Sequence, residues 1–279
     1  MLHVRFALPV LLLALITPLR AAVSIDIDLD RLRAMPGAAT IAATLAAALP
    51  DSARARLAAL DSRFGFVPGR DLRRVVITVP ERGAPSVRLV GLPAERIVAA
   101  LAADGGGTTT YASGLVGHAL PRRPQASFVA LAADQALIAC GDRLASDAAA
   151  PAALLAPVAG QAVVVRVVPG AHPRLPAMRL VQHGEMRLDG AGVIRATVVA
   201  HDDVGAVELE RRFGVLTRML AVGAEGGLEP AIDLAPVLAG ARLTRSGTTL
   251  ELALTVPEAL RAKAVERLLA RLTSRLGAG

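Results

Sequence analysis

The sequence predicts an α+β protein built from two related modules, each a mainly antiparallel sheet with helices packed on one face. Short β-branched or alternating runs are separated by turn residues, which indicates strands paired in hairpins. A helical pattern follows such pairs of runs, and this strand–strand–helix order ends near Ala103, again near Ala221 and again near Leu276. The repetition is one of pattern and not of identical residues.

The N-terminus has the layout of a secretory signal peptide, which we predict to span residues 1–22. Arg5 precedes an almost wholly apolar stretch, residues 6–19, and two alanines follow Arg20. A retained membrane anchor is the alternative, but about 14 residues fall short of the roughly 20 needed to cross a bilayer as a helix. We therefore expect cleavage and export to the periplasm or beyond.

A segment rich in alanine and proline, residues 148–160, marks the expected boundary between the modules. The first module then covers residues 23–150 and the second residues 160–279. No later segment is apolar for 18 residues, so we expect no transmembrane segment in the mature chain. The single cysteine, Cys140, excludes an intramolecular disulfide and is expected to be a buried, inert thiol.

One stretch of the first module shows the repeated unit clearly. Residues 75–79 are all β-branched and predict a strand, and residues 83–85 predict a turn. Residues 86–91 alternate in the manner of a second strand. Pro93 then opens a helix, because proline suits a first turn, and Asp104-Gly105 closes it.

The other elements follow from the same signals. In the first module we expect the following: a strand at 24–30, helices at 38–49 and 53–60, hairpins at 108–111 with 115–120 and at 127–132 with 136–139, and a helix from Asp142. In the second module we expect the following: a strand at 162–168, hairpins at 179–189 with 193–200 and at 241–245 with 248–255, and helices from Asp203, at 231–238 and from Val256 to about Leu276.

Two of these helices carry a clear apolar stripe. Asp203 is expected to cap the first, whose buried face we predict from the 3.6-residue period to be Leu209, Phe213, Leu216 and Leu220. The last helix has a capping box, Thr255-Val256-Pro257-Glu258. Its expected stripe consists of Leu260, Val265, Leu268, Leu269, Leu272 and Leu276.

Several short motifs resemble a group of uncharacterised exported bacterial proteins built from two related α+β modules. They are residues 28–32 (DLDRL), Phe64-Gly65-Phe66, Asp71-Leu72, residues 90–93 (VGLP) with Arg96-Ile97, Gly141, the Asp202 helix, the Gly247 hairpin and Val256-Pro257-Glu258. The resemblance spans nearly all of the mature chain. It implies export and a duplicated fold, and it brings no catalytic residues.

Charge and aromatic content limit the possible partners. The formal net charge is +7, and removal of Arg5 and Arg20 with the leader leaves +5 (7 − 2). This indicates an anionic partner, although the charges are spread along the chain. Tryptophan is absent and Tyr111 is the only tyrosine, so the stacking platforms of single-stranded nucleic-acid and carbohydrate sites are missing. We expect no nucleic-acid partner.

No motif predicts a catalytic, cofactor or metal site. Asp26, Asp28 and Asp30 alternate on an expected strand, which favours a solvated face over a calcium site. The four histidines of the mature chain lack zinc-ligand spacing, and neither a nucleophile elbow nor a phosphate loop is present. The candidates for a site assembled by folding are His183, His201 and Asp203.

The first functional hypothesis is therefore an exported, non-catalytic binding or structural protein of the bacterial envelope. It would act on a protein or an envelope component through its sheet surface or the groove between modules. The alternative is a small-ligand-binding protein or hydrolase whose site at the module interface uses His183, His201 and Asp203. A third is association with an anionic surface through Arg267, Arg271 and Arg275, which flank the stripe of the last helix.

Overall fold

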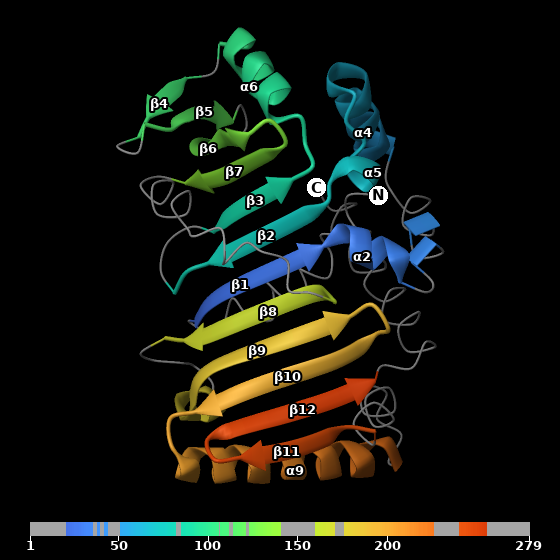
Figure 1. The fold of residues 1–279 in the computed structure, drawn as a ribbon, viewed down its shortest axis with the longest axis vertical. Helices are drawn as coiled ribbons and strands as arrows, with labels where there is room; N and C mark the ends of the chain where they lie inside the picture. Colours follow the sequence, from blue (N-terminus) through green and yellow to red (C-terminus); the bar gives the residue numbers. More distant parts are fainter. Residues whose placement is uncertain are drawn as a thin grey trace.

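The fold is α+β, with one large antiparallel sheet and few helices, as the sequence predicted at this level (Figure 1). It is seen in a computed structural model. That model describes residues 21–35, 38–39, 42–43, 51–81, 85–105, 107–111, 114–120, 123–140, 160–170, 176–225 and 240–255. Within this part of the chain twelve strands form one sheet, in the order β11-β12-β10-β9-β8-β1-β2-β3-β7-β6-β5-β4.

The predicted hairpins are confirmed with small shifts of their ends. The first-half strands are β1 (Ala21–Asp28), β2 (Arg74–Val79), β3 (Ser86–Val90), β4 (Thr108–Thr110), β5 (Val116–Leu120), β6 (Arg123–Ala132) and β7 (Gln135–Cys140). The second-half strands are β8 (Gln161–Pro169), β9 (Val181–Asp189), β10 (Val193–Ala200), β11 (Arg242–Ser246) and β12 (Thr249–Thr255). β1 pairs with β2 on one side and β8 on the other, so both halves share one continuous sheet.

The described helices are α2 (Leu29–Ala34), α4 (Asp51–Phe64), α5 (Pro68–Asp71), α6 (Ala94–Ala103) and α9 (Asp203–Glu225), with a 3-10 turn, η2, at Pro176–Leu180. The helix predicted after Pro93 is thus confirmed as α6, and Asp104 caps its C-terminus. None of these helices has the length and apolar character needed to cross a membrane.

Gly91 allows the chain to turn tightly between β3 and α6. Its φ is +95°, a conformation that side chains with a Cβ rarely adopt. A Cβ at this position would lie only 2.2 Å from the carbonyl oxygen of Asp71 and 2.8 Å from the amide nitrogen of Arg73. The close approach of these two backbone segments therefore requires glycine.

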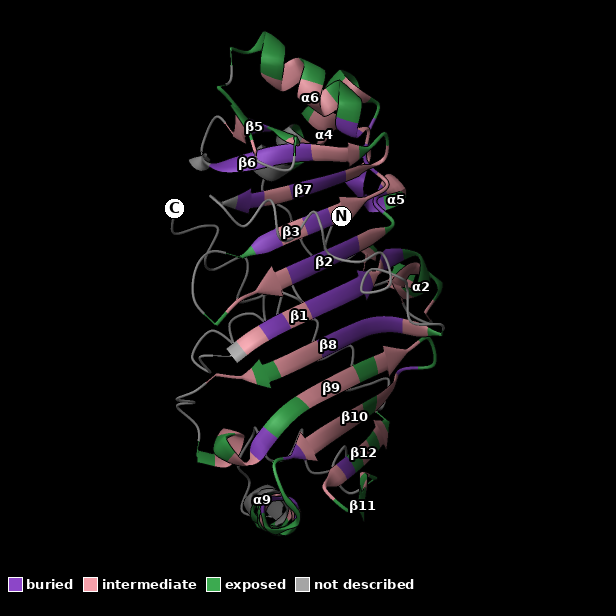
Figure 2. Cartoon of the chain, turned by 60° about the vertical axis from the view of Figure 1, so that its left-hand side comes forward, coloured by how far each residue is buried: buried purple, intermediate pink, exposed green. Residues whose placement is uncertain are grey.

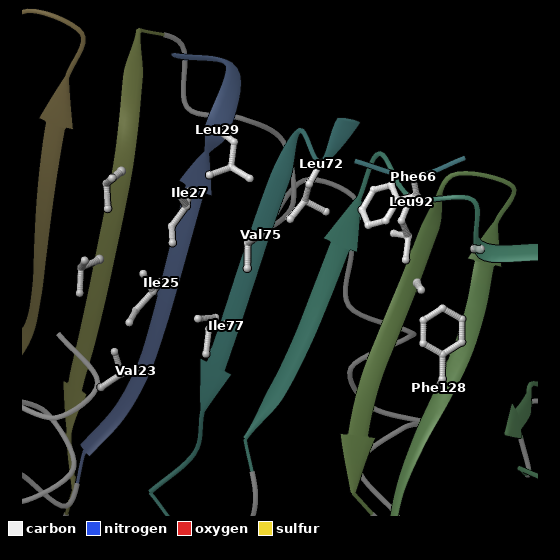
Figure 3. Close-up of a cluster of buried hydrophobic side chains, with 14 residues drawn as sticks. Val23, Ile25, Ile27, Leu29, Phe66, Leu72, Val75, Ile77, Leu92 and Phe128 are labelled. Atoms are coloured by element: carbon white, nitrogen blue, oxygen red, sulfur yellow. The ribbon is translucent and has the colours of Figure 1, made fainter. Parts of the chain in front are cut away.

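The largest hydrophobic cluster lies on one face of the central strands (Figure 3). Val23, Ile25 and Ile27 of β1 are almost completely buried there. Leu32 of α2, Phe64 of α4 and Ile97, Val98 and Leu101 of α6 pack against the cluster, so these helices cover the same face. Burial of this apolar area is the main contribution to stability, since one cysteine cannot form a disulfide within the chain.

α9 packs against the other end of the sheet and covers the same face. Ala206 and Leu209 form a small cluster with Ala200, Leu243 and Leu250. Residues that lie directly opposite each other on paired strands point to the same side of the sheet. One such row runs from Leu250 through Val198, Gly184 and Val167 to Val23. Leu250, which α9 contacts, is therefore on the same side as the central cluster. We call this side of the sheet the core face.

Three local predictions are wrong in detail. The strand expected at 24–30 ends at Asp28, whose carboxylate accepts a hydrogen bond from Arg31 N and starts α2. The cap of α9 is Asp202, which accepts from Gly205 N at 2.6 Å, and not Asp203. Leu216, expected on the buried face of this helix, is 50% exposed.

Other predictions fall on residues outside the described ranges. They are the predicted signal peptide over residues 1–20, residues 83–84 of the predicted turn, the boundary segment at 148–159, the helices from Asp142, at 231–238 and from Val256, and most of the helix at 38–49.

Candidate functional site

The face opposite the core face carries most of the charged side chains of the second-half strands. Because successive strand residues point to opposite sides, alternate positions of β8 to β12 share this side. They include Arg166, Glu185, Arg187, Arg195, Thr197, Arg242, Thr244 and Glu251. We call this side of the sheet the polar face.

The four outer strands of the second half, β9, β10, β12 and β11, are made mostly of half-buried and exposed residues (Figure 2). The exposed members of the polar face there include His183, Arg187, Arg195, Arg242 and Glu251. By contrast, Asp26 on the same side of β1 is buried, with 5% of its surface exposed. The accessible part of the polar face is therefore the outer four strands of the second half.

Three arginines form one row across these four strands. Arg187 of β9 lies directly opposite Arg195 of β10, Arg195 lies opposite Ala253 of β12, and Ala253 lies opposite Arg242 of β11. Neighbouring strands are roughly 4.8 Å apart, so Arg187 and Arg195 leave the sheet side by side, whereas Arg242 stands two strands, roughly 10 Å, from Arg195. We call this set the arginine row.

Two acids neutralise part of this charge. The carboxylate of Glu185 accepts a hydrogen bond from Arg166 Nε at 2.7 Å and also pairs with Arg187. Asp189 pairs with Arg195 at 3.1 Å. Arg242 makes no ion pair with a described residue. The arginine row therefore keeps an excess of positive charge, and its directly opposed like charges oppose folding of the sheet.

Asp189 also organises the turn beside the row. Its Oδ1 accepts hydrogen bonds from Ala191 N at 2.9 Å and Val193 N at 3.0 Å. Burial acts to raise the pKa of Asp189, but these two N–H groups and the guanidinium of Arg195 outweigh it and hold the pKa below its usual value. Asp189 is thus an ionised, structural residue that positions Arg195.

The three alternating aspartates do not make a metal site. Asp26 pairs with Arg74, Asp28 pairs with Arg31, and Asp30, which lies in α2, pairs with Arg33. The solvated face expected from their spacing is wrong for Asp26, which is buried. Within the described ranges no group of three histidines, cysteines or acids is placed to hold a metal ion.

The candidates His183, His201 and Asp203 come to one corner of the sheet. His183 lies opposite Val199 near the end of β10, His201 follows that strand, and its backbone N–H donates to Leu180 O at 3.0 Å. Asp203 begins α9. All three are exposed, and their side chains make no hydrogen bond or ion pair with described residues. Topology places them near each other, but it does not enclose them.

His118 is a polar residue that the sequence did not single out. It lies on β5 opposite Phe128, is 7% exposed, and its Nδ1 has no hydrogen-bond partner within the described part of the chain. The sequence could have predicted its burial, because His118 alternates with Val116 and Leu120 along one strand and so shares their side.

Comparison with known proteins adds little to this picture. No family model matches the chain, and no curated protein matches it either. One solved structure, described as crystal form I of TP0453, is similar at 12% sequence identity with a TM-score of 0.42. The match covers 92% of this chain and 96% of that one. At these values we draw no conclusion from the likeness.

Proposed function

We propose that this chain is an exported, non-catalytic binding protein of the bacterial envelope that recognises an anionic envelope component through the arginine row. The observation that carries the proposal is the exposed row of Arg187, Arg195 and Arg242 on an open sheet face. Two arginines directly opposite each other destabilise the sheet, and a negatively charged ligand bound to them would offset this repulsion. Arginine also binds carboxylate and phosphate groups through two parallel hydrogen bonds.

The test compares two variants of equal net charge. The first replaces Arg187, Arg195 and Arg242 with alanine, and the control replaces the exposed arginines Arg54, Arg63 and Arg70 with alanine. Each protein is immobilised and used to capture components of the native envelope. We expect the row variant to lose the captured component while the control retains it, and we expect binding to weaken as salt is raised. Equal capture by the two variants refutes the proposal.

Export is the second part of the proposal. It is supported by the apolar stretch at 6–19 and by the ladder between β1 and β2, which begins at Val23. A cut after Ala22 therefore preserves this ladder and removes only the first two pairs between β1 and β8, Ala21 with Pro169 and Ala22 with Val168. N-terminal sequencing of the protein from fractionated cells tests it, and a chain that starts at Met1 in the cytoplasm contradicts it.

We further propose that residues 23–150 and 160–279 are two related modules. In support, β1-β2-β3-α6-β6-β7 and β8-β9-β10-α9-β11-β12 follow the same path. In each half the first three strands lie in sequence order, the last strand pairs with the third, and the strand that precedes the last one in sequence lies outside it. If each half buries its own core, a protease site inserted between residues 148 and 160 should yield two fragments that remain associated through β1 and β8.

A small-ligand-binding protein or hydrolase remains the alternative, with His183, His201 and Asp203 as its candidate residues. Their exposure does not favour it, since catalysis depends on positioned groups in a site that excludes water.

A further inference from the structure

α9, at one end of the sheet, exposes large apolar residues along its whole length (Figure 1). Between 39% and 78% of the surface of each is exposed. They are Val204, Val207, Val215, Leu216, Met219 and Val222. The opposite side of the helix is occupied, because Ala206 and Leu209 pack on Leu243 and Leu250 of the sheet. Six exposed apolar side chains on one helix indicate a surface that binds a partner.

Three of these valines and three charged residues form a straight row on the side of α9 that faces away from the sheet. The row consists of Val204, Glu208, Arg211, Val215, Arg218 and Val222. Its steps alternate between four and three residues, which is the spacing of the contact line between two paired helices. We call these six residues the outer row.

The outer row is symmetric about Phe213, which lies near the middle of α9. Its members form three pairs whose positions are equally far from Phe213, by nine (222 − 213), five (218 − 213) and two (215 − 213) residues. The pairs are Val204 with Val222, Glu208 with Arg218, and Arg211 with Val215. In an antiparallel pair of α9 helices with its two-fold axis level with Phe213, each residue therefore meets its complement from the second copy. Valine meets valine, glutamate meets arginine, and the aliphatic stem of an arginine meets valine.

The charges of the outer row specify the antiparallel orientation. Arg218 donates to the backbone carbonyl of Gly214 and makes no ion pair with a residue of the described ranges, so its guanidinium can reach Glu208 of a second copy. Glu208 pairs with Arg211 and Arg212 of its own chain, but a carboxylate has lone pairs for a further donor. A parallel pair would instead place each charged residue opposite the same residue of the other copy, and these like charges would repel.

We propose that the outer row of α9 is the contact surface of a symmetric, antiparallel dimer of this chain. The partner that covers the exposed apolar surface is thus a second copy of the same helix. The contact is a single pair of helices, and the outer row carries two arginines against one glutamate, so the dimer forms reversibly at high protein concentration. Because α9 covers the core face, the arginine row on the opposite face of the sheet stays accessible in the dimer.

Disulfide crosslinking between two single-cysteine variants tests the orientation. Val204→Cys and Val222→Cys are made separately in the full-length protein with Cys140→Ser, so that each variant has one thiol. Under mild oxidation a mixture of the two should form a linked dimer, because the two positions meet across the two-fold axis. Either variant alone should form at least about tenfold less, since its two copies of the thiol lie roughly 27 Å (18 × 1.5 Å) apart along the helices. Val116→Cys, an exposed apolar position on β5, replaces either partner to measure random collisions.

A charge reversal tests the pairing of Glu208 with Arg218. Arg218→Glu places two carboxylates opposite each other at two points of the contact, so the dimer should weaken by about tenfold or more. Arg96→Glu makes the same charge change at an exposed position of α6 and should leave the dimer unchanged. Sedimentation at increasing protein concentration measures both variants, and circular dichroism checks that they are folded. Sedimentation of the unsubstituted chain tests for the dimer without relying on the folding of any variant.

Three outcomes overturn the proposal. The first is a monomeric mass at every concentration together with no excess of crosslinked dimer in the mixture. The second is crosslinking of either variant alone that equals crosslinking of the mixture, which indicates a parallel or unspecific contact. The third is a chain that stays monomeric but binds vesicles of anionic lipid and loses this binding in Arg218→Glu, which assigns the outer row to a lipid surface.

Discussion

Arg74 of β2 donates two hydrogen bonds to the carboxylate of Asp26 on β1, with Nε 2.7 Å from Oδ1. Only 12% of the Arg74 side chain and 7% of the Asp26 side chain are exposed. A buried ion pair of this kind contributes little net stability, because removing both charges from water costs about as much as their attraction returns. Removal of one partner, by contrast, is strongly destabilising, because it leaves the other charge buried and unpaired.

We therefore predict that Arg74→Met destabilises the protein by about 3–5 kcal/mol, since it leaves the Asp26 carboxylate buried without its partner. The double change Asp26→Leu with Arg74→Met should bring stability back to within about 1 kcal/mol of the original or above it. Urea unfolding measures both. Arg54→Met, which breaks the exposed pair with Asp51, is the control and should cost no more than about 1 kcal/mol.

Gly91 offers a test of the backbone argument. Gly91→Ala must place a Cβ 2.2 Å from Asp71 O at a φ of +95°, so we expect a loss of at least about 2–4 kcal/mol. Gly105→Ala has a similar φ of +72°, but nothing lies within 4 Å of its Cβ. This matched change should cost only about 1–2 kcal/mol. Similar losses at the two positions, measured by thermal unfolding, would contradict the steric account.

Glu208 should make stability depend on acid pH. Hydrogen bonds from Arg211 and Arg212 lower its pKa from 4.5 to about 2. Because the pKa is depressed in the folded state, the associated stability is present above pH 4.5 and is lost as the pH falls toward 2. Glu208→Gln should flatten the fall in unfolding free energy over this range. Replacing Arg211 and Arg212 together by glutamine should flatten it equally if the pairs are the cause.

Asp189 competes with any anionic ligand for Arg195. Asp189→Asn can still accept the hydrogen bonds from Ala191 and Val193, but it no longer neutralises the guanidinium. We expect this variant to capture the envelope component more tightly than the unmodified protein. Asp104→Asn, which removes an exposed acid paired with Arg63, changes the net charge identically and should leave capture unchanged. A weaker capture by Asp189→Asn argues against the arginine row.

The histidine candidates can be tested in the same assay. His183 lies on the polar face, whereas His201 follows β10 in a bend, and both are exposed. His183→Ala and His201→Ala should each retain capture, because neither residue contributes to the arginine row. If either change abolishes binding or a measured turnover, the result supports the alternative function, a small-ligand-binding protein or hydrolase with its site at these residues.

Much of the local structure could be predicted from the sequence. The β-branched run at 75–79, the alternation at 86–91 and Pro93 predicted β2, β3 and α6, because each signal depends on backbone preferences of residues close in the chain. The errors fall where two local signals compete. Asp28 fits an alternating strand and also a helix cap, and the hydrogen bond to Arg31 N decides for the cap.

The candidate site was less accessible to prediction. The spacing of charges along each strand is visible in the sequence, but Arg187, Arg195 and Arg242 are separated by up to 55 residues (242 − 187). Only the register of three strand pairs places them in one row. In the same way, the period of α9 predicted one apolar face, whereas packing on Leu243 and Leu250 left Leu216 outside.

The sequence by itself determined the class of the fold, the positions of most hairpins and the absence of disulfides. The tertiary structure alone decided the strand order, the burial of Asp26 with Arg74 and the exposure of the outer strands. The physical reason is that periodicity shows which residues alternate along a strand, but the partners and the covering layer of that strand depend on contacts between segments far apart in the chain.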